Sequence, residues 1–152
     1  MNRKEQAMAY FKEGYNCAQA VFLAFRDLTG FEEKTALRLA APFGGGLGRQ
    51  REVCGAVSGM CMAAGALYGY DNLSKSEAKV AHYKMIQALC NEFRARSGGS
   101  IICRDLLGSE GKDTAATPAA RTESYYQTRP CAELVGEAAD ILDEWIKAHP
   151  LS

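Results

Sequence analysis

A glycine-rich loop leading into a helix of small residues constrains the fold of this chain more than any other stretch. Glycine stands at positions 44, 45, 46 and 48, and the segment that follows, 52–68, is rich in Ala, Gly and Met. Gly55, Gly59 and Gly65 would each weaken an isolated helix by about 1 kcal/mol relative to alanine. We expect close packing to offset this cost, because small side chains let another helix approach. The segment 52–68 is therefore predicted to be the buried central helix.

The rest of the chain also shows helical periodicity, and no segment has the alternating β-branched pattern of a strand. Ser74 and Glu77 match a capping box. Thr117 before Pro118 predicts another helix start. We predict an all-α fold: a compact bundle of about five to seven helices that forms a single domain over residues 1–152. The segments with a helical pattern are 2–13, 17–30, 31–41, 52–68, 74–96, 101–107, 118–127 and 131–149.

Charge and hydropathy exclude several classes of protein. The 18 basic and 18 acidic residues balance, which argues against a nucleic-acid or anionic-membrane surface. There is no run of 18 apolar residues, so membrane insertion is not expected. The polar N-terminus does not resemble a secretory signal, and we expect a cytoplasmic protein whose thiols stay reduced.

Four of the six cysteines fall where local signals predict the first turn of a helix. They are Cys17, Cys54, Cys103 and Cys131. A helix N-terminus carries partial positive charge, which favours thiolate over thiol, and Arg49 and Arg51 add charge upstream of Cys54. A thiolate is both the nucleophile of disulfide exchange and a ligand for soft metals. These four residues are therefore the candidate catalytic or metal-ligating groups.

The other two cysteines, Cys61 and Cys90, have a plainer interpretation. Cysteine is among the most buried residue types, so both are predicted to fill the core. Cys61 follows Cys54 by seven residues, two helical turns, so it could instead resolve a disulfide with that residue.

Local metal signatures are missing. The chain has no C-x-x-C pair, as a thioredoxin motif or zinc ribbon would require, and no C-x-x-C-H motif for covalent haem. Four dispersed cysteines could still converge in space on an iron–sulfur cluster or, less favoured, on zinc. The spacing leaves both alternatives open.

The glycine loop resembles a phosphate cradle but lacks the lysine and Ser/Thr of a P-loop, and no strand precedes it. We favour a turn that brings backbone N–H groups near the Cys54 sulfur, where they would stabilise a thiolate or tune a cluster. The candidate cofactor-binding residues are Gly44, Gly45, Gly46, Arg49, Arg51, Gly55 and Gly59.

The residues assembled so far resemble a known family. The segment 54–59, CGAVSG, matches a CGAxxG motif with one cysteine upstream and two downstream. Together with the blocks GYNCAQAVFLAF and APFGGGLGR, this pattern is similar to that of the C_GCAxxG_C_C proteins of bacteria and archaea. The resemblance implies redox activity through four shared cysteines, which match the four named above. A related domain of split-Soret cytochromes is associated with haem and an iron–sulfur site, but this chain lacks the haem motif.

These observations lead to one main hypothesis and two alternatives. The main one is a thiol-based redox protein that forms reversible disulfides or holds an iron–sulfur cluster, and that works with a redox partner protein or a transporter. The first alternative is a structural metal-binding protein or a non-catalytic scaffold. The second is a helical bundle that binds an anionic group at the glycine loop. The small-residue central helix also predicts a homodimer.

Overall fold

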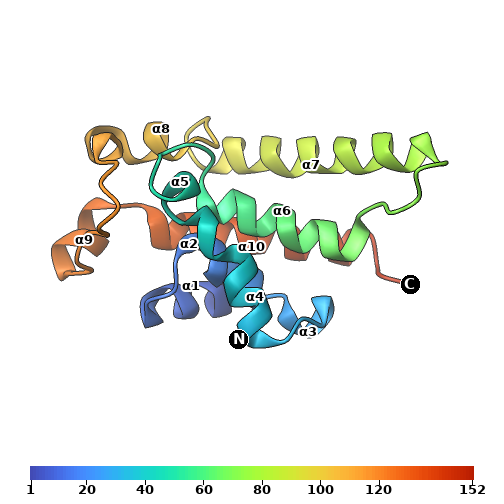
Figure 1. The fold of residues 1–152 in the computed structure, drawn as a ribbon, viewed down its shortest axis with the longest axis horizontal. Helices are drawn as coiled ribbons and strands as arrows, with labels where there is room; N and C mark the ends of the chain where they lie inside the picture. The colour runs from blue at the N-terminus through green and yellow to red at the C-terminus, as the bar shows by residue number, and fades with distance from the viewer.

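The computed structural model describes residues 1–152 as helices joined by turns and loops (Figure 1). The predicted all-α fold is confirmed, but the helices outnumber the five to seven that the sequence predicts. The segment α5 contains left-handed residues and is a turn rather than a helix. The elements are α1 (Arg3–Glu13), α2 (Cys17–Leu23), α3 (Arg26–Thr29), α4 (Glu33–Ala40), η1 (Ala41–Phe43), α5 (Gly44–Leu47), α6 (Gly55–Tyr68), α7 (Ser76–Arg96), α8 (Cys103–Leu107), η2 (Gly108–Lys112), α9 (Glu123–Thr128) and α10 (Cys131–Ala148).

The extra helices arise because one predicted helix is interrupted. The segment 17–30 divides into α2 and α3 at Phe25, whose φ of −113° and ψ of 13° are not helical. Gly30 then ends α3 in the left-handed conformation that favours glycine.

Two predicted helix starts are wrong. Ser74 does not cap α7, because its backbone N–H and its hydroxyl both donate to the Asn72 side chain. Helix α7 begins two residues later without a side-chain cap. The chain is not helical after Pro118 either. Thr122 supplies the cap of α9 instead, by accepting the backbone N–H of Tyr125.

The helices form layers around α6 and α10. In Figure 1, α7 runs along one side of these two helices, and α1, α2 and α4 lie on the other side. The segments α5, α8 and α9 gather at one end. No helix is both long enough and apolar enough to span a membrane.

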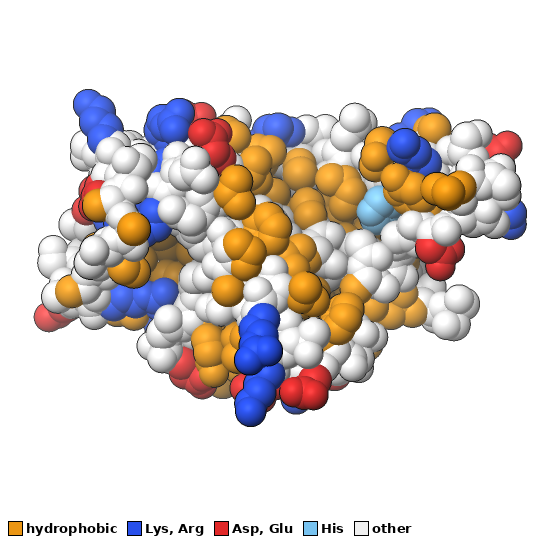
Figure 2. All heavy atoms as spheres, in the orientation of Figure 1, with side chains coloured by type: hydrophobic (Ala, Val, Ile, Leu, Met, Phe, Trp, Pro, Cys, Tyr) orange, Lys and Arg blue, Asp and Glu red, His pale blue; other side chains and the backbone are white.

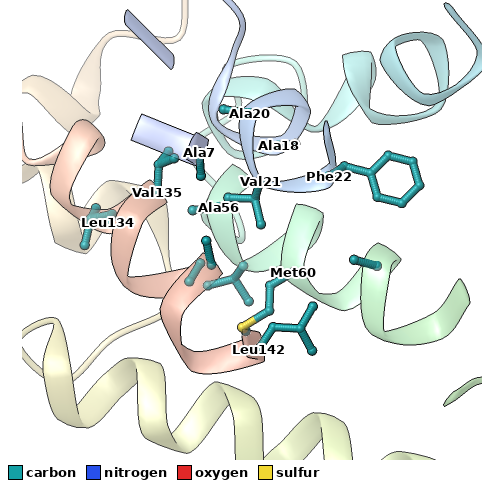
Figure 3. Close-up of a cluster of buried hydrophobic side chains, with 14 of the residues drawn as sticks. Ala7, Ala18, Ala20, Val21, Phe22, Ala56, Met60, Leu134, Val135 and Leu142 are labelled. Carbon is teal, nitrogen blue, oxygen red and sulfur yellow. The ribbon is translucent and has the colours of Figure 1, made fainter. Parts of the chain in front are cut away.

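The core lies where α1, α2, α6 and α10 meet. Figure 3 shows Ala7 of α1 near Val135 of α10, and Met60 of α6 beside Leu142 of α10. These four side chains are completely buried. Fully burying a side chain the size of Val, Leu or Met contributes about 1.5–3 kcal/mol, so this cluster is a main source of stability.

Helix α6 is buried, as the sequence predicts, and glycine is what lets α2 approach it. A Cβ atom on Gly59 would lie 2.5 Å from the carbonyl oxygen of Ala18, and one on Gly55 would lie 3.1 Å from the Cβ of Cys17. Gly65 differs, because a Cβ there would meet no atom within 4 Å. The small-residue face of α6 is thus occupied by α2 of the same chain. The argument for a homodimer from this face no longer holds, and the oligomeric state stays a prediction.

Alanine substitutions at two glycines of α6 test this close approach. Gly59→Ala should lower the free energy of unfolding by about 1–3 kcal/mol, because the new methyl group meets the α2 backbone and cannot be moved aside cheaply. Gly65→Ala is the matched control and should raise it by about 0.5–1 kcal/mol, because alanine is the better helix former and the space is open. Urea unfolding followed by circular dichroism measures both. Equal effects at the two positions would contradict the packing described here.

Candidate functional site

The four candidate cysteines lie at helix starts and line one cavity. Cys17, Cys103 and Cys131 are the first residues of α2, α8 and α10, and Cys54 is the N-cap of α6. The cavity has a volume of about 430 Å³. In Figure 2 the molecule is hollowed at the end where α8 and α9 lie, with apolar and basic side chains around the hollow.

A short backbone pairing joins the starts of α6 and α8. Val53 and Ile102 form an isolated antiparallel bridge. The N–H of Cys54 donates to the Ile101 carbonyl oxygen at 2.7 Å, and the N–H of Cys103 donates to that of Glu52 at 2.7 Å. This pairing keeps residues 101 and 102 extended. The sequence predicts that Cys103 is the third residue of its helix. In the structure it is the first residue of α8.

The glycine loop lies against Cys103. Residues 45–49 all have φ between 60° and 72°. Leu47 and Arg49 belong to this run, although non-glycine residues rarely adopt it. Gly46 is buried, and a Cβ on it would lie 2.8 Å from the Cβ of Cys103. The missing side chain of Gly46 therefore lets Cys103 pack directly against the backbone of the loop.

The predicted loop contact with Cys54 is wrong. The backbone N–H groups that bond its sulfur come from Ala56 and Val57, in the first turn of its own helix. Of the seven candidate cofactor-binding residues, six line the cavity, and Gly59 packs against α2 instead. The six are Gly44, Gly45, Gly46, Arg49, Arg51 and Gly55.

Four arginines line the cavity, and no Asp, Glu or Lys does. Two of them, Arg49 and Arg51, are predicted site residues. Arg121 and Arg129 join them from either side of α9. The sequence contains no local signal for Arg121, which lies in the predicted helix 118–127 far along the chain from the glycine loop. Tyr125 also lines the cavity, although the sequence predicts only a core or interface role for it.

Cys17 and Cys131 are in direct contact, and the contact separates their pKa values. The interaction between the two sulfurs favours a thiolate at Cys131 and a thiol at Cys17, which lowers the pKa of Cys131 to about 7 and raises that of Cys17. Burial opposes the lowering at Cys131, but the charge of Arg129, the Tyr125 hydroxyl and the charge of Arg51 add to it. Among the four cavity cysteines, Cys131 is thus the one best prepared to act as a nucleophile near neutral pH.

The other two cavity cysteines stay protonated. Burial raises the pKa of Cys54 to about 12, although the N–H groups of its helix favour the thiolate. Burial also raises the pKa of Cys103 and outweighs Arg51, whose Nη1 lies 3.6 Å from the Cys103 sulfur. The expectation that helix starts favour thiolates is therefore wrong for these residues, because desolvation is the larger effect.

The thiols as arranged do not fit a metal site. No three side chains of His, Cys, Asp or Glu come close enough together to hold a metal ion. A tetrahedral zinc site or a cluster held by four thiolates needs such convergence. The cavity cysteines therefore lack the donor arrangement of either group.

Cys61 and Cys90 form a second pair outside this cavity. Cys61 is half-buried on α6, and its thiol interacts with that of Cys90 of α7, which raises the pKa of Cys61 and lowers that of Cys90 to about 7. Cys61 thus meets Cys90 rather than Cys54. The core role predicted for Cys90 fits its burial.

Comparison with known proteins identifies one family. A family model described as "Putative redox-active protein (C_GCAxxG_C_C)" matches residues 15–145. No curated protein and no solved structure matches the chain. The matched segment contains all four cysteines of the cavity and both cysteines of the second pair.

Alkylation tests the separation of the pKa values. The rate at which iodoacetamide modifies Cys131 should rise with a midpoint near pH 7, because only the thiolate reacts and the pKa of Cys131 is about 7. Cys103, measured in the same digest by mass spectrometry, should react only at higher pH, because its pKa is raised. Arg129→Gln should move the Cys131 midpoint upward, since it removes a positive charge that favours the thiolate. A Cys131 profile that coincides with that of Cys103 would contradict the assignment.

Proposed function

Because the chain belongs to the C_GCAxxG_C_C family, we propose that it is a thiol–disulfide oxidoreductase with Cys131 as nucleophile and Cys17 as resolving thiol. The observation that carries this proposal is the contact between these two thiols at the cavity, with Cys131 favoured as thiolate. A pair of adjacent thiols with unequal pKa values is suited to reversible exchange, in which one thiol attacks and the other resolves.

The exchange has two steps. The Cys131 thiolate attacks one sulfur of a substrate disulfide, the substrate S–S bond breaks, and a thiolate leaves and takes a proton from water. Cys17 then gives up its proton, and its thiolate attacks the Cys131 sulfur of the mixed disulfide. The S–S bond between Cys131 and the substrate breaks, and the departing substrate sulfur takes the proton. The products are two substrate thiols and one Cys17–Cys131 disulfide. The same steps in reverse oxidise a dithiol, and a dithiol-bearing redox partner would reset the protein.

The surrounding groups support this assignment. Arg129 and the Tyr125 hydroxyl stabilise negative charge on the Cys131 sulfur before it attacks the substrate. Cys54 and Cys103 remain thiols at neutral pH and do not attack the substrate in this scheme. The scheme has no step that uses a metal, in keeping with the missing convergence of ligands.

Serine variants test the two roles. With bis(2-hydroxyethyl) disulfide at pH 7, the unmodified chain should form a Cys17–Cys131 disulfide, mapped by mass spectrometry. Cys17→Ser should stop at the mixed disulfide on Cys131, because the resolving thiol is gone. The cavity of Cys131→Ser should react at least roughly 50-fold more slowly, because a thiol of pKa 9 or above is at most about 1% ionised at pH 7 and one of pKa 7 is half ionised.

The second thiol pair provides the control for these variants. Cys90→Ser should leave the rate of Cys131 oxidation and the Cys17–Cys131 product unchanged, since Cys90, whose pKa is also about 7, does not line the cavity. A disulfide that links Cys54 to Cys103 instead, or full reactivity in Cys131→Ser, would overturn the assigned roles.

Metal analysis tests whether the protein works without a bound metal. Protein purified without oxygen should be colourless and free of stoichiometric iron and zinc, and a chelator should leave its melting temperature unchanged. A visible absorbance accompanied by iron and sulfide would favour the iron–sulfur alternative. Stoichiometric zinc whose removal unfolds the chain would favour a structural metal protein.

A further inference from the structure

The cavity carries more positive charge than the protein neutralises. Arg49 pairs with Asp113 at 3.4 Å, and Arg129 pairs with Glu110 at 3.1 Å. Arg51 and Arg121 have no carboxylate partner within ion-pair distance. They donate to backbone carbonyl groups instead, which carry no full charge. Two guanidinium groups without a carboxylate partner therefore line a cavity that contains four cysteines and no carboxylate.

Arg51 is the member of this set that points to a ligand. Its side chain is buried, with only 2% of the residue exposed, and its Nη2 atom has no hydrogen-bond partner. Its Nε donates to the Asp113 carbonyl oxygen, and its Nη1 lies near the Cys103 sulfur, so the guanidinium orientation is defined by the protein. A buried, charged donor left unsatisfied costs free energy that an anionic acceptor would recover.

The walls of the cavity indicate the size and character of that ligand. Leu106, Leu107 and Leu134 line the same space as the arginines. A volume of about 430 Å³ falls within the range of small-molecule sites and exceeds what a single inorganic oxyanion fills. The cavity therefore suits an organic molecule with an apolar body and an anionic group.

We propose that the substrate is a small organic disulfide bearing a carboxylate, which pairs with the guanidinium group of Arg51 while its sulfurs meet Cys131. This inference rests on the function proposed above and specifies the substrate class for the same site. Arg121 adds a second positive charge, and its guanidinium stacks 4.0 Å from the centroid of the Phe11 ring. One carboxylated disulfide and the two protein thiols become two carboxylated thiols and the Cys17–Cys131 disulfide. Two electrons and two protons pass to the substrate.

Three disulfides of similar size test the proposal on the unmodified chain. They are 3,3′-dithiodipropionate, which is anionic, bis(2-hydroxyethyl) disulfide, which is neutral, and cystamine, which is cationic. The rate of Cys131 oxidation by each is divided by the rate of the same disulfide with N-acetylcysteine amide, which corrects for intrinsic reactivity. The normalised rates should fall in the order anionic, neutral, cationic, with at least a tenfold advantage of the anionic over the neutral disulfide.

Variants of the arginines locate the selectivity. Arg51→Gln should bring the ratio of anionic to neutral rates close to one, and Arg51→Lys should restore part of it. Arg121→Gln should lower the ratio as well. Arg104→Gln is the matched control and should leave it unchanged, because Arg104 is an exposed arginine that does not line the cavity. The ratio is internal to each variant, so a change in the reactivity of Cys131 affects both rates and cancels.

The outcomes separate this inference from the function on which it rests. If no disulfide oxidises Cys131, the proposed function is wrong and the substrate class is wrong with it. If all three react in proportion to their intrinsic reactivity, the exchange stands and the preference for a carboxylate is overturned. The proposed role of Arg51 is also overturned if Arg104→Gln lowers the ratio as much as Arg51→Gln does. Selectivity would then reflect the general charge of the surface.

Discussion

The close approach of α2 and α6 is the constraint on which the rest of the structure depends. Gly59 lies against the carbonyl of Ala18, and Gly55, one turn earlier, lies against Cys17. Side chains at these positions would separate the two helices at their N-terminal ends. Because the helices touch there, Cys17 and Cys54 reach the same cavity from different elements. The glycines of the CGAxxG motif thus act through packing, and the cysteine acts through its position beside that packing.

The chemistry of the cavity reflects a competition between burial and local charge. All four thiols sit at helix starts, where unpaired N–H groups favour the thiolate. Burial opposes this at every position and prevails at Cys54 and Cys103. Of these four, only Cys131 has a lowered pKa, because its interaction with the Cys17 thiol and with Arg129 and Tyr125 outweighs the effect of burial. With one thiolate and three thiols, the site has a single nucleophile with a resolving thiol beside it.

The left-handed loop contributes through its arginines as well as its glycines. Arg49 and Arg51 both have positive φ, an uncommon conformation that costs a residue with a side chain free energy. Arg49 holds the carbonyl groups of Ala115 and Thr117, which fixes the segment that covers the cavity. Arg51 reaches Cys103 and keeps one donor free. Strain of this kind is typical of sites where function requires one geometry.

The local features of the chain were readable from the sequence. Helical periodicity determined the all-α class, glycine content marked α6 as buried, and four cysteines could be placed at helix starts. These predictions succeed because capping, helix propensity and backbone freedom act over only a few residues. Where two local signals competed, as at Ser74 and Thr117, the prediction failed, because a neighbouring side chain or a later cap was used instead.

Only the tertiary structure decided which thiols meet and what surrounds them. Cys17 and Cys131 are separated by more than a hundred residues, and Arg121 bonds to the carbonyls of Phe11 and Tyr15 across a similar distance. Such contacts depend on how whole helices pack, which no local pattern encodes. Burial, too, is a property of the packed chain, so the sequence could place a cysteine at a helix start but could not say which of the four would ionise. The unpartnered Nη2 of Arg51 could not be predicted from the sequence either. Whether a donor has a hydrogen-bond partner depends on the atoms that folding places around it.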